Sequence, residues 1–145
     1  MTIAVLLSAV LLAVCTAVHY GALRAVAGVI GSRCAPGRGL ACAVAGIALA
    51  HVLEAGLYTG GFWFAVHGAT IGTLEPSSES APPPELMDYF YFSLVNFTTL
   101  GRGDLVPQGH LRFITAIEAF HGFLLITASG SFVLQVMAGK NPFRA

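Results

Sequence analysis

The stretch that decides how this chain is interpreted is Thr98-Thr99-Leu100-Gly101-Arg102-Gly103-Asp104. It overlaps an apolar, aromatic-rich run at 89–100 that is only 12 residues long, whereas a helix needs about 20 residues to cross a bilayer. The two glycines and the nearby Pro107 end that run. Irregular backbone at membrane depth is tolerated only where it is buried in protein or lines a water-filled cavity. The stretch therefore indicates a re-entrant segment that faces a pore.

The composition of the chain is typical of an integral membrane protein. Of its 145 residues, 56% are hydrophobic and 10% are charged, whereas a soluble domain carries about 25% charged residues. The mean hydropathy is +0.78. These values exclude a soluble globular protein, a disordered chain and a nucleic-acid binder. The cysteines, Cys15, Cys34 and Cys42, have no C-x-x-C spacing, so we predict neither a disulfide framework nor a zinc site built from them.

Three long apolar runs predict three transmembrane helices, at 2–29, 40–68 and 111–138. The short run and the loop after it, at 89–104, are predicted to form a pore helix and its filter. With short connections between these elements, the whole chain, 1–145, is predicted to be a single membrane domain.

The charges of the loops predict the orientation. The region between the first two helices carries Arg24, Arg33 and Arg38, and the C-terminal stretch carries Lys140 and Arg144. By the positive-inside rule both regions would face the cytoplasm, so the N-terminus and the acidic, proline-rich linker before the short run would face outside. No basic residue precedes Arg24, which argues against a signal peptide. We expect an integral protein of the bacterial inner (plasma) membrane.

Residues 91–107 resemble the pore helix and selectivity filter of the potassium-channel superfamily, whose pattern T-T-V/L-G-Y-G-D here reads T-T-L-G-R-G-D. The resemblance covers about residues 40–138. It includes His51-Val-Leu-Glu54, similar to an H-x-x-E in small bacterial members, and the stretch 117–122, similar to the part of the inner helix that ends at a hinge glycine. The resemblance implies an all-α, potassium-channel-like pore domain with an extra N-terminal helix.

The resemblance also implies the roles of single residues. The filter would consist of Thr98, Thr99, Leu100, Gly101, Arg102, Gly103 and Asp104. The carbonyls of Thr99, Leu100, Gly101 and Arg102 would hold a permeant monovalent cation, potassium or sodium. Asp104 would attract cations at the outer mouth, and Gly122 would be the hinge. Because one chain supplies one filter loop, a closed pore implies a homotetramer in the lipid bilayer.

Beyond the permeant ions we expect no metal, no cofactor, no catalytic residue and no nucleic-acid partner. No phosphate-binding glycine loop or nucleophile motif is present in the sequence. The chain is therefore predicted to be a channel and not an enzyme.

Arg102 departs from the family, which has a tyrosine at this position. Four guanidinium groups at roughly 9 Å from the axis would each disfavour a central cation by about 2 kcal/mol at an effective dielectric constant of about 20, and together by about 7 kcal/mol. We therefore expect the Arg102 side chain to point behind the filter and to pair with Glu118, or failing that with Asp104. The departure favours a cation pore with altered selectivity, while an anion-tolerant pore and a non-conducting filter stay open.

Other interpretations stay open at this point. His51 and Glu54 lie three residues apart on one helix face and are predicted to form a polar or ion-pair cluster, which Glu118 would join unless it pairs with Arg102. His19 and His121 either join this cluster or face a wet cavity. A membrane enzyme would need His51, Glu54 and His121 to converge as a metal site. A non-conducting channel-like scaffold, or a partner in a heteromer, is the alternative to a conducting pore.

Overall fold

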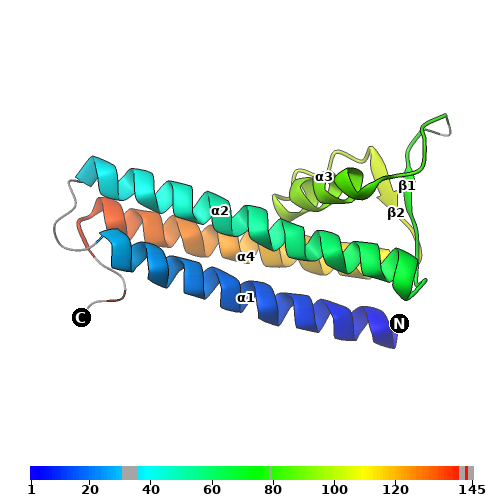
Figure 1. Ribbon diagram of the computed structural model, residues 1–145, viewed down its shortest axis with the longest axis horizontal. Coiled ribbons are helices and arrows are strands. Elements are labelled where there is room, and N and C mark those ends of the chain that lie inside the picture. The colour runs from blue at the N-terminus through cyan, green and yellow to red at the C-terminus, as the bar shows by residue number, and fades with distance from the viewer. Residues whose placement is uncertain (31–35, 79, 141–142, 144–145) are drawn as a thin grey trace.

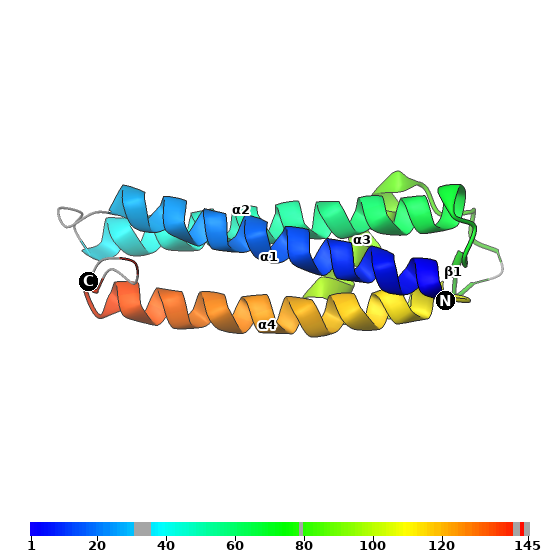
Figure 2. The same ribbon diagram turned by 90° about the horizontal axis from the view of Figure 1, so that it is seen from below.

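The computed structural model describes residues 1–30, 36–78, 80–140 and 143. The order of elements is α1 (Thr2–Ile30), α2 (Pro36–Trp63), a π-helical turn (Phe64–Gly68), β1 (Leu74–Pro76), α3 (Leu86–Phe97), β2 (Leu105–Pro107) and α4 (Leu111–Met137). The three long helices α1, α2 and α4 run side by side (Figure 1, Figure 2). The short helix α3 packs on α2 and α4 at the end of the molecule that holds the N-terminus, and α4 ends at the opposite end.

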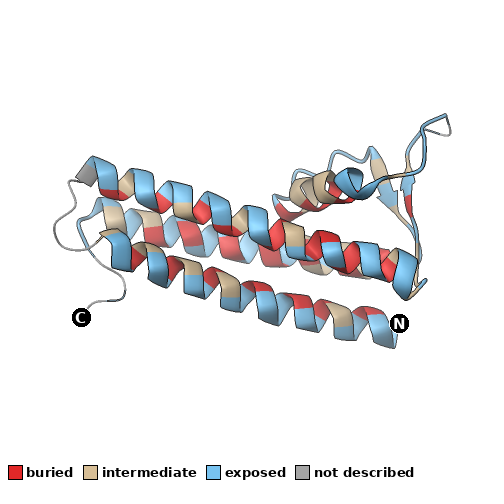
Figure 3. Ribbon diagram, viewed as in Figure 1, coloured by how far each residue is buried: buried red, intermediate tan, exposed pale blue. Residues whose placement is uncertain are grey.

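Three helices are long and apolar enough to cross a membrane, at Thr2–Ile30, Gly37–Gly68 and Leu111–Met137, which confirms the predicted fold class. Each turns a stripe of buried residues toward the others (Figure 3). On α1 this stripe recurs at intervals of three or four residues, which is the spacing of one helix face; it consists of Ala4, Ser8, Leu11, Cys15, His19, Leu23 and Ala27. The other apolar side chains of the spans are largely exposed in one chain, so lipid or further protein must cover them.

The second long helix differs from the sequence prediction at its start. α2 begins at Pro36 instead of residue 40, because proline is tolerated in the first helical turn, where its missing N–H would have no partner anyway. At its other end α2 widens into the π-helical turn, in which the Ala69 N–H donates to the Phe64 carbonyl at 2.8 Å. The chain then leaves the bundle toward β1.

A short antiparallel ribbon, which the sequence did not predict, closes the end of the molecule beside α3. β1 pairs with β2 in the register Leu74↔Pro107. Outside the ribbon, the Ser77 N–H donates to the Asp104 carbonyl at 2.9 Å, and the Gln108 N–H donates to the Thr73 carbonyl at 2.8 Å. These bonds fix the far end of the loop after α3 to the segment that follows α2.

The C-terminal end of α3 reaches the middle of α4. The backbone of Phe97 lies so close to Gly122 that a Cβ atom at position 122 would collide with the Phe97 carbonyl. Gly122 is eleven residues beyond Leu111, the first residue of α4, which is about 16 Å along a helix axis. A bilayer's hydrocarbon core is about 30 Å thick. The loop that follows α3 therefore begins near mid-membrane.

Buried polar contacts hold α3 against both neighbouring helices. Glu118 on α4 is fully buried and accepts hydrogen bonds from Ser93 Oγ at 2.5 Å and Asn96 Nδ2 at 2.6 Å. The Ser93 hydroxyl also lies 2.8 Å from the Ala55 carbonyl on α2, and Asn96 Nδ2 lies 2.8 Å from the Thr115 carbonyl on α4. The last turns of α3 are thus fixed in place just before the loop.

Gly122→Ala is expected to destabilise the protein, because the added Cβ meets backbone of α3 that has no room to move. Overpacking of this kind costs about 1–3 kcal/mol. Gly130→Ala on the same helix is the matched control, since nothing lies within 4 Å of a Cβ at that position. Thermal unfolding of both variants in lipid nanodiscs measures the difference, and equal stabilities would contradict the close contact. The hinge role of Gly122 stays a prediction, because α4 continues through it as one helix.

Glu118→Gln is expected to loosen α3. A glutamine offers one carbonyl oxygen, which can accept from Asn96, while its NH₂ group donates to the Ser93 hydroxyl, and that hydroxyl keeps the Ala55 carbonyl as an acceptor. Two bonds to a carboxylate are thereby replaced by bonds between neutral groups; bonds to charged groups contribute about 1.5–3 kcal/mol, whereas neutral ones contribute about 0.5–1.5 kcal/mol. Glu75→Gln at an exposed position of β1 removes the same charge and is the control. Amide hydrogen exchange of α3 should accelerate in the first variant alone; unchanged protection would show that the Glu118 bonds do not hold this helix.

Candidate functional site

The loop after α3 has a backbone of alternating handedness. Thr99, Gly101 and Gly103 have φ angles of 60°, 54° and 77°, whereas the residues between them do not have positive φ. The glycines take up this conformation without steric cost, but a threonine does so rarely. Such alternation allows successive carbonyl groups to face the same side of the chain, as they do in a carbonyl-lined filter.

The C-terminal cap of α3 explains the unusual conformation of Thr99. The Leu100 N–H donates to the Val95 carbonyl at 3.0 Å, and the Thr99 N–H donates to the Asn96 carbonyl at 2.8 Å. This pair of bonds is a Schellman motif, in which the residue after the C-cap is left-handed. The Thr98 hydroxyl adds a bond of 3.1 Å to the same Val95 carbonyl. The end of the helix and the first residues of the loop therefore form one hydrogen-bonded unit.

Every residue of the loop from Thr98 to Asp104 is exposed in a single chain. The apolar side chain of Leu100 is 67% exposed. Hydrocarbon offers backbone N–H and C=O groups no partners, so a loop at this depth cannot face lipid. Further protein and water must therefore cover it.

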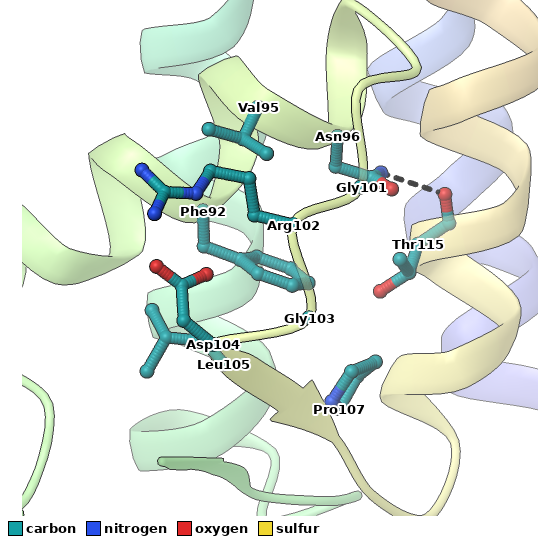
Figure 4. Close-up of a pocket in the computed structure, with 10 residues that line it drawn as sticks. All are labelled: Phe92, Val95, Asn96, Gly101, Arg102, Gly103, Asp104, Leu105, Pro107 and Thr115. Carbon is teal, nitrogen blue, oxygen red and sulfur yellow. Dashed lines mark hydrogen bonds between the residues drawn. The ribbon is translucent and has the colours of Figure 1, made fainter. Parts of the chain in front are cut away.

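Arg102 and Asp104 project from the same side of the loop, away from Thr115 of α4 (Figure 4). The Tyr91 hydroxyl on α3 donates to Asp104 Oδ2 at 2.8 Å. This bond to the carboxylate raises the pKa of the Tyr91 hydroxyl, and the Arg102 side chain interacts with the same hydroxyl. The three side chains form a polar group on the α3 side of the loop.

The predicted pairing of Arg102 with Glu118 is wrong. The Glu118 carboxylate already accepts hydrogen bonds from two side chains of α3, which reach it directly from the helix packed against α4, whereas Arg102 is exposed. Among the residues that the structure describes, no carboxylate lies within 4 Å of the Arg102 guanidinium, so Asp104 forms no close ion pair with it either. The expected position on the α3 side of the loop, by contrast, agrees with the structure.

A cavity of about 160 Å³ separates the loop from α3 and α4 (Figure 4). Phe92 and Asn96 of α3, Arg102 of the loop and Thr115 of α4 are among the residues that line it. The Thr115 hydroxyl is buried and has no hydrogen-bond partner within the described part of the chain. A cavity of this volume, with a few polar groups in a mostly apolar wall, has room for water.

A second polar group lies between the long helices, and we call it the three-helix cluster: His19 of α1, His51 and Glu54 of α2, and Ser129 of α4. The two oxygens of the fully buried Glu54 carboxylate lie 3.0 Å from His19 Nδ1 and 2.9 Å from His51 Nδ1. Ser129 Oγ lies 3.3 Å and 3.2 Å from the Nε2 atoms of the same rings. The structure thus brings His51 and Glu54 together and adds His19 and Ser129 to them. Glu118 does not belong to this cluster, because its carboxylate bonds to α3.

The grouping that a membrane enzyme would need does not form. His121 bonds through Nδ1 to the Tyr58 hydroxyl and through Nε2 to the Thr16 hydroxyl, both at 3.0 Å. Both ring nitrogens of His121 therefore have partners other than the Glu54 carboxylate. His19, and not His121, is the second histidine beside Glu54.

Ser93 and Asn96 were not assigned from the sequence, and His19 was left between two roles, although a signal for each existed. Ser93 and Asn96 are polar residues three positions apart in an otherwise apolar run, so they face the same side of one helix. His19 is a titratable residue in a span without acidic residues, where such a residue requires a polar partner. Neither signal identifies the partner, which lies on another helix.

The comparisons with known proteins agree with this architecture. A family described as "Ion channel" matches residues 40–138, a range that contains α3, the loop and α4 completely and most of α2. The uncharacterized membrane protein YdjJ of Bacillus subtilis (strain 168) is 38% identical over 69 residues.

Those residues are 47% of this chain and 20% of YdjJ, so the similarity spans about a fifth of that relative. No solved structure matches the chain significantly. The three apolar helices and the membrane relative make the chain an integral membrane protein. Because the family match covers more than half of its length, the chain belongs to the ion channel family.

Proposed function

We propose that four copies of this chain form a cation-conducting pore in which the loop Thr98–Asp104 of each copy is the selectivity filter. The observation that carries this proposal is the loop itself. It begins near mid-membrane, it alternates in backbone handedness, and it is exposed along its whole length in one chain. Membership of the ion channel family supports a pore, and the number of copies and the filter positions are inferred from the loop.

The exposed surfaces support a closed ring of identical chains. The helices of its own chain cover only one side of the loop, so the other side is exposed. In addition, α4 exposes the side chains of Phe120, Phe123 and Leu124. A ring gives every copy the same neighbours and leaves no loop uncovered. An open assembly would leave a terminal loop in hydrocarbon, which is costly. Four copies is the number that the resemblance to potassium channels implies.

The filter residues would coordinate the permeant ion through backbone oxygens. In this proposal the carbonyls of Thr99, Leu100, Gly101 and Arg102 replace the hydration shell of a monovalent cation. The C-terminal end of α3 carries partial negative charge and ends at Phe97, near mid-membrane. That charge favours a cation at the inner side of the filter.

The polar group of Arg102, Asp104 and Tyr91 would set the selectivity. Four arginines and four aspartates give the rim of the filter no net charge. With the guanidinium beside Tyr91, on the α3 side of the loop, the positive charge is kept away from the ion path. An arginine at position 102 does not pack behind the filter as the family's tyrosine does. We therefore expect a cation pore whose ratio of potassium to sodium flux differs from that of the family.

The orientation follows from the arrangement of the ends. The N-terminus and the β ribbon lie at one end of the bundle and the end of α4 lies at the other (Figure 1). Lys140 follows α4 at that end, and Arg38 lies in the first turn of α2. By the positive-inside rule this end faces the cytoplasm, in the inner membrane of a bacterium. The loop then opens to the outside through the ribbon end.

A non-conducting scaffold, or a subunit of a heteromer, is the competing function, and Arg102 is the observation that favours it. If its guanidinium turned from α3 into the axis, four positive charges would block cations. An ion-flux measurement separates the two functions directly. Purified protein in liposomes that contain a potassium or sodium gradient should dissipate that gradient faster than empty liposomes.

Arg102→Tyr should increase the ratio of potassium to sodium flux, because it restores the residue that the potassium-channel pattern has at this position. Arg112→Tyr is the matched control. It makes the same replacement at an exposed arginine near the same end of the bundle, away from the loop. Flux of potassium and sodium is measured for both variants in the same liposomes.

An unchanged flux ratio in Arg102→Tyr would refute the role of this residue in selectivity. No flux through either the wild type or Arg102→Tyr would favour the scaffold over the pore. Flux of chloride in place of cations would show that the guanidinium groups face the axis.

A further inference from the structure

The three-helix cluster has no role in the proposed pore, yet it concentrates ionisable groups inside the bundle. Glu54 is fully buried and His19 is 3% exposed. The rings of His19 and His51 stack with centroids 5.3 Å apart. Ionisable groups within membrane spans are costly and tend to mark functional sites. The composition of this cluster, two imidazoles and a carboxylate, indicates which ligand it would take.

The geometry of the cluster is that of a metal site. One ligand atom from each of His19, His51 and Glu54 can be chosen so that all three lie within 4.8 Å of one another. Two histidine nitrogens and a carboxylate oxygen form a known zinc ligand set, which leaves a fourth position to water. The His51 side chain is 17% exposed in one chain, whereas Glu54 is fully buried.

The possible positions of the hydrogen atoms on the two imidazole rings are consistent with a bound cation. Ser129 Oγ faces the Nε2 atoms of both His19 and His51, and a hydroxyl has one proton to donate but two lone pairs to accept with. If both Nε2 atoms carry hydrogen, Ser129 accepts from both. The two Nδ1 lone pairs then point at the Glu54 carboxylate, which is repulsive unless a cation lies between them.

The remaining neutral arrangements each leave an unfavourable contact. If one ring carries hydrogen at Nδ1 and the other at Nε2, Ser129 is satisfied, but the Nδ1 lone pair of the second ring still faces the Glu54 carboxylate. If both Nδ1 atoms donate to Glu54, both Nε2 atoms need a donor, and Ser129 can serve only one of them. A single additional proton shared by the two rings would also satisfy the cluster. The competing occupants are therefore a metal ion and one proton, and metal binding distinguishes them.

We propose that His19 Nδ1, His51 Nδ1 and Glu54 bind one divalent transition-metal ion of the zinc class per chain, with Ser129 orienting both rings. An acceptor for the second ring nitrogen is the usual support of a metal-bound histidine. Calcium and magnesium are disfavoured because they prefer oxygen ligands throughout, whereas imidazole suits zinc, cobalt, nickel and copper.

The ion would tie the first helix to the pore. Residue 19 belongs to α1, which lies outside the part of the chain that matches the ion channel family, and residues 51 and 54 belong to α2 within it. The His51 ring also contacts the ring of Phe97, the last residue of α3, at a centroid distance of 5.5 Å. A bound metal would therefore fix α1 close to the base of the filter. The site exists whether or not the pore conducts.

The test is metal binding by the full chain, purified in detergent and stripped with a chelator. Zinc is titrated in competition with a chromogenic chelator, and cobalt is titrated while its visible absorption is recorded. We expect one ion per chain. His19→Ala and Glu54→Gln should abolish this binding, and Ser129→Ala should weaken it by about 10- to 100-fold, as loss of a supporting hydrogen bond does.

His121→Ala is the matched control, because it removes another buried histidine of the same bundle without touching the proposed ligands. Its metal binding should equal that of the wild type. His19→Cys, which keeps a ligand atom, should retain binding and add a thiolate-to-cobalt absorption band, so a failure to fold can be told from loss of a ligand. Equal zinc binding by the wild type and His19→Ala would overturn the proposal. The absence of zinc binding in folded wild-type protein would also overturn it and leave a shared proton as the occupant.

Discussion

A polar backbone in the middle of a bilayer must have every N–H and C=O group satisfied, and the structure is organised around one loop that violates this rule in a single chain. The residues from Thr98 to Asp104 are all exposed, at a depth where lipid offers no hydrogen bonds. Only water in a pore and neighbouring protein chains can cover such a loop. The position of the loop therefore supports the proposed channel of several copies.

The elements around the loop keep it at that depth. Glu118 holds α3 through Ser93 and Asn96, and Gly122 lets the end of α3 approach α4 closely. At the other side of the loop, the β ribbon ties its exit to the segment after α2. Both ends of a flexible, glycine-containing segment are thus fixed, which is what a filter needs if its carbonyl groups are to keep one orientation.

Hydropathy predicted the spans well because the thickness of a bilayer fixes how long an apolar helix must be. The positive φ angles at Gly101 and Gly103 have an equally local cause, because glycine adopts them without steric cost. Thr99 was not expected to share that conformation, because its cause is a helix cap whose two bonds appear only in three dimensions.

The partners of buried charges were the part that the sequence could not supply. Arg102 and Glu118 are opposite charges on elements expected to be neighbours, so pairing them was reasonable. The sequence does not show that α3 places two neutral donors directly on Glu118, and these donors make the arginine unnecessary. For the same reason the sequence left open whether His19 joins Glu54 or faces a wet cavity, since their contact joins residues 35 positions apart on two apolar helices. The strands β1 and β2 were missed because three-residue strands that contain proline have no readable alternation.

The most direct measurement of the central claim is a density map of the purified complex in lipid nanodiscs that contain potassium. The predicted result is four chains around one axis, with the carbonyl oxygens of residues 99–102 directed at the axis and ion density between them. A complex of two or three chains, or a loop from Thr98 to Asp104 that faces lipid or lies away from any symmetry axis, would contradict a fourfold filter.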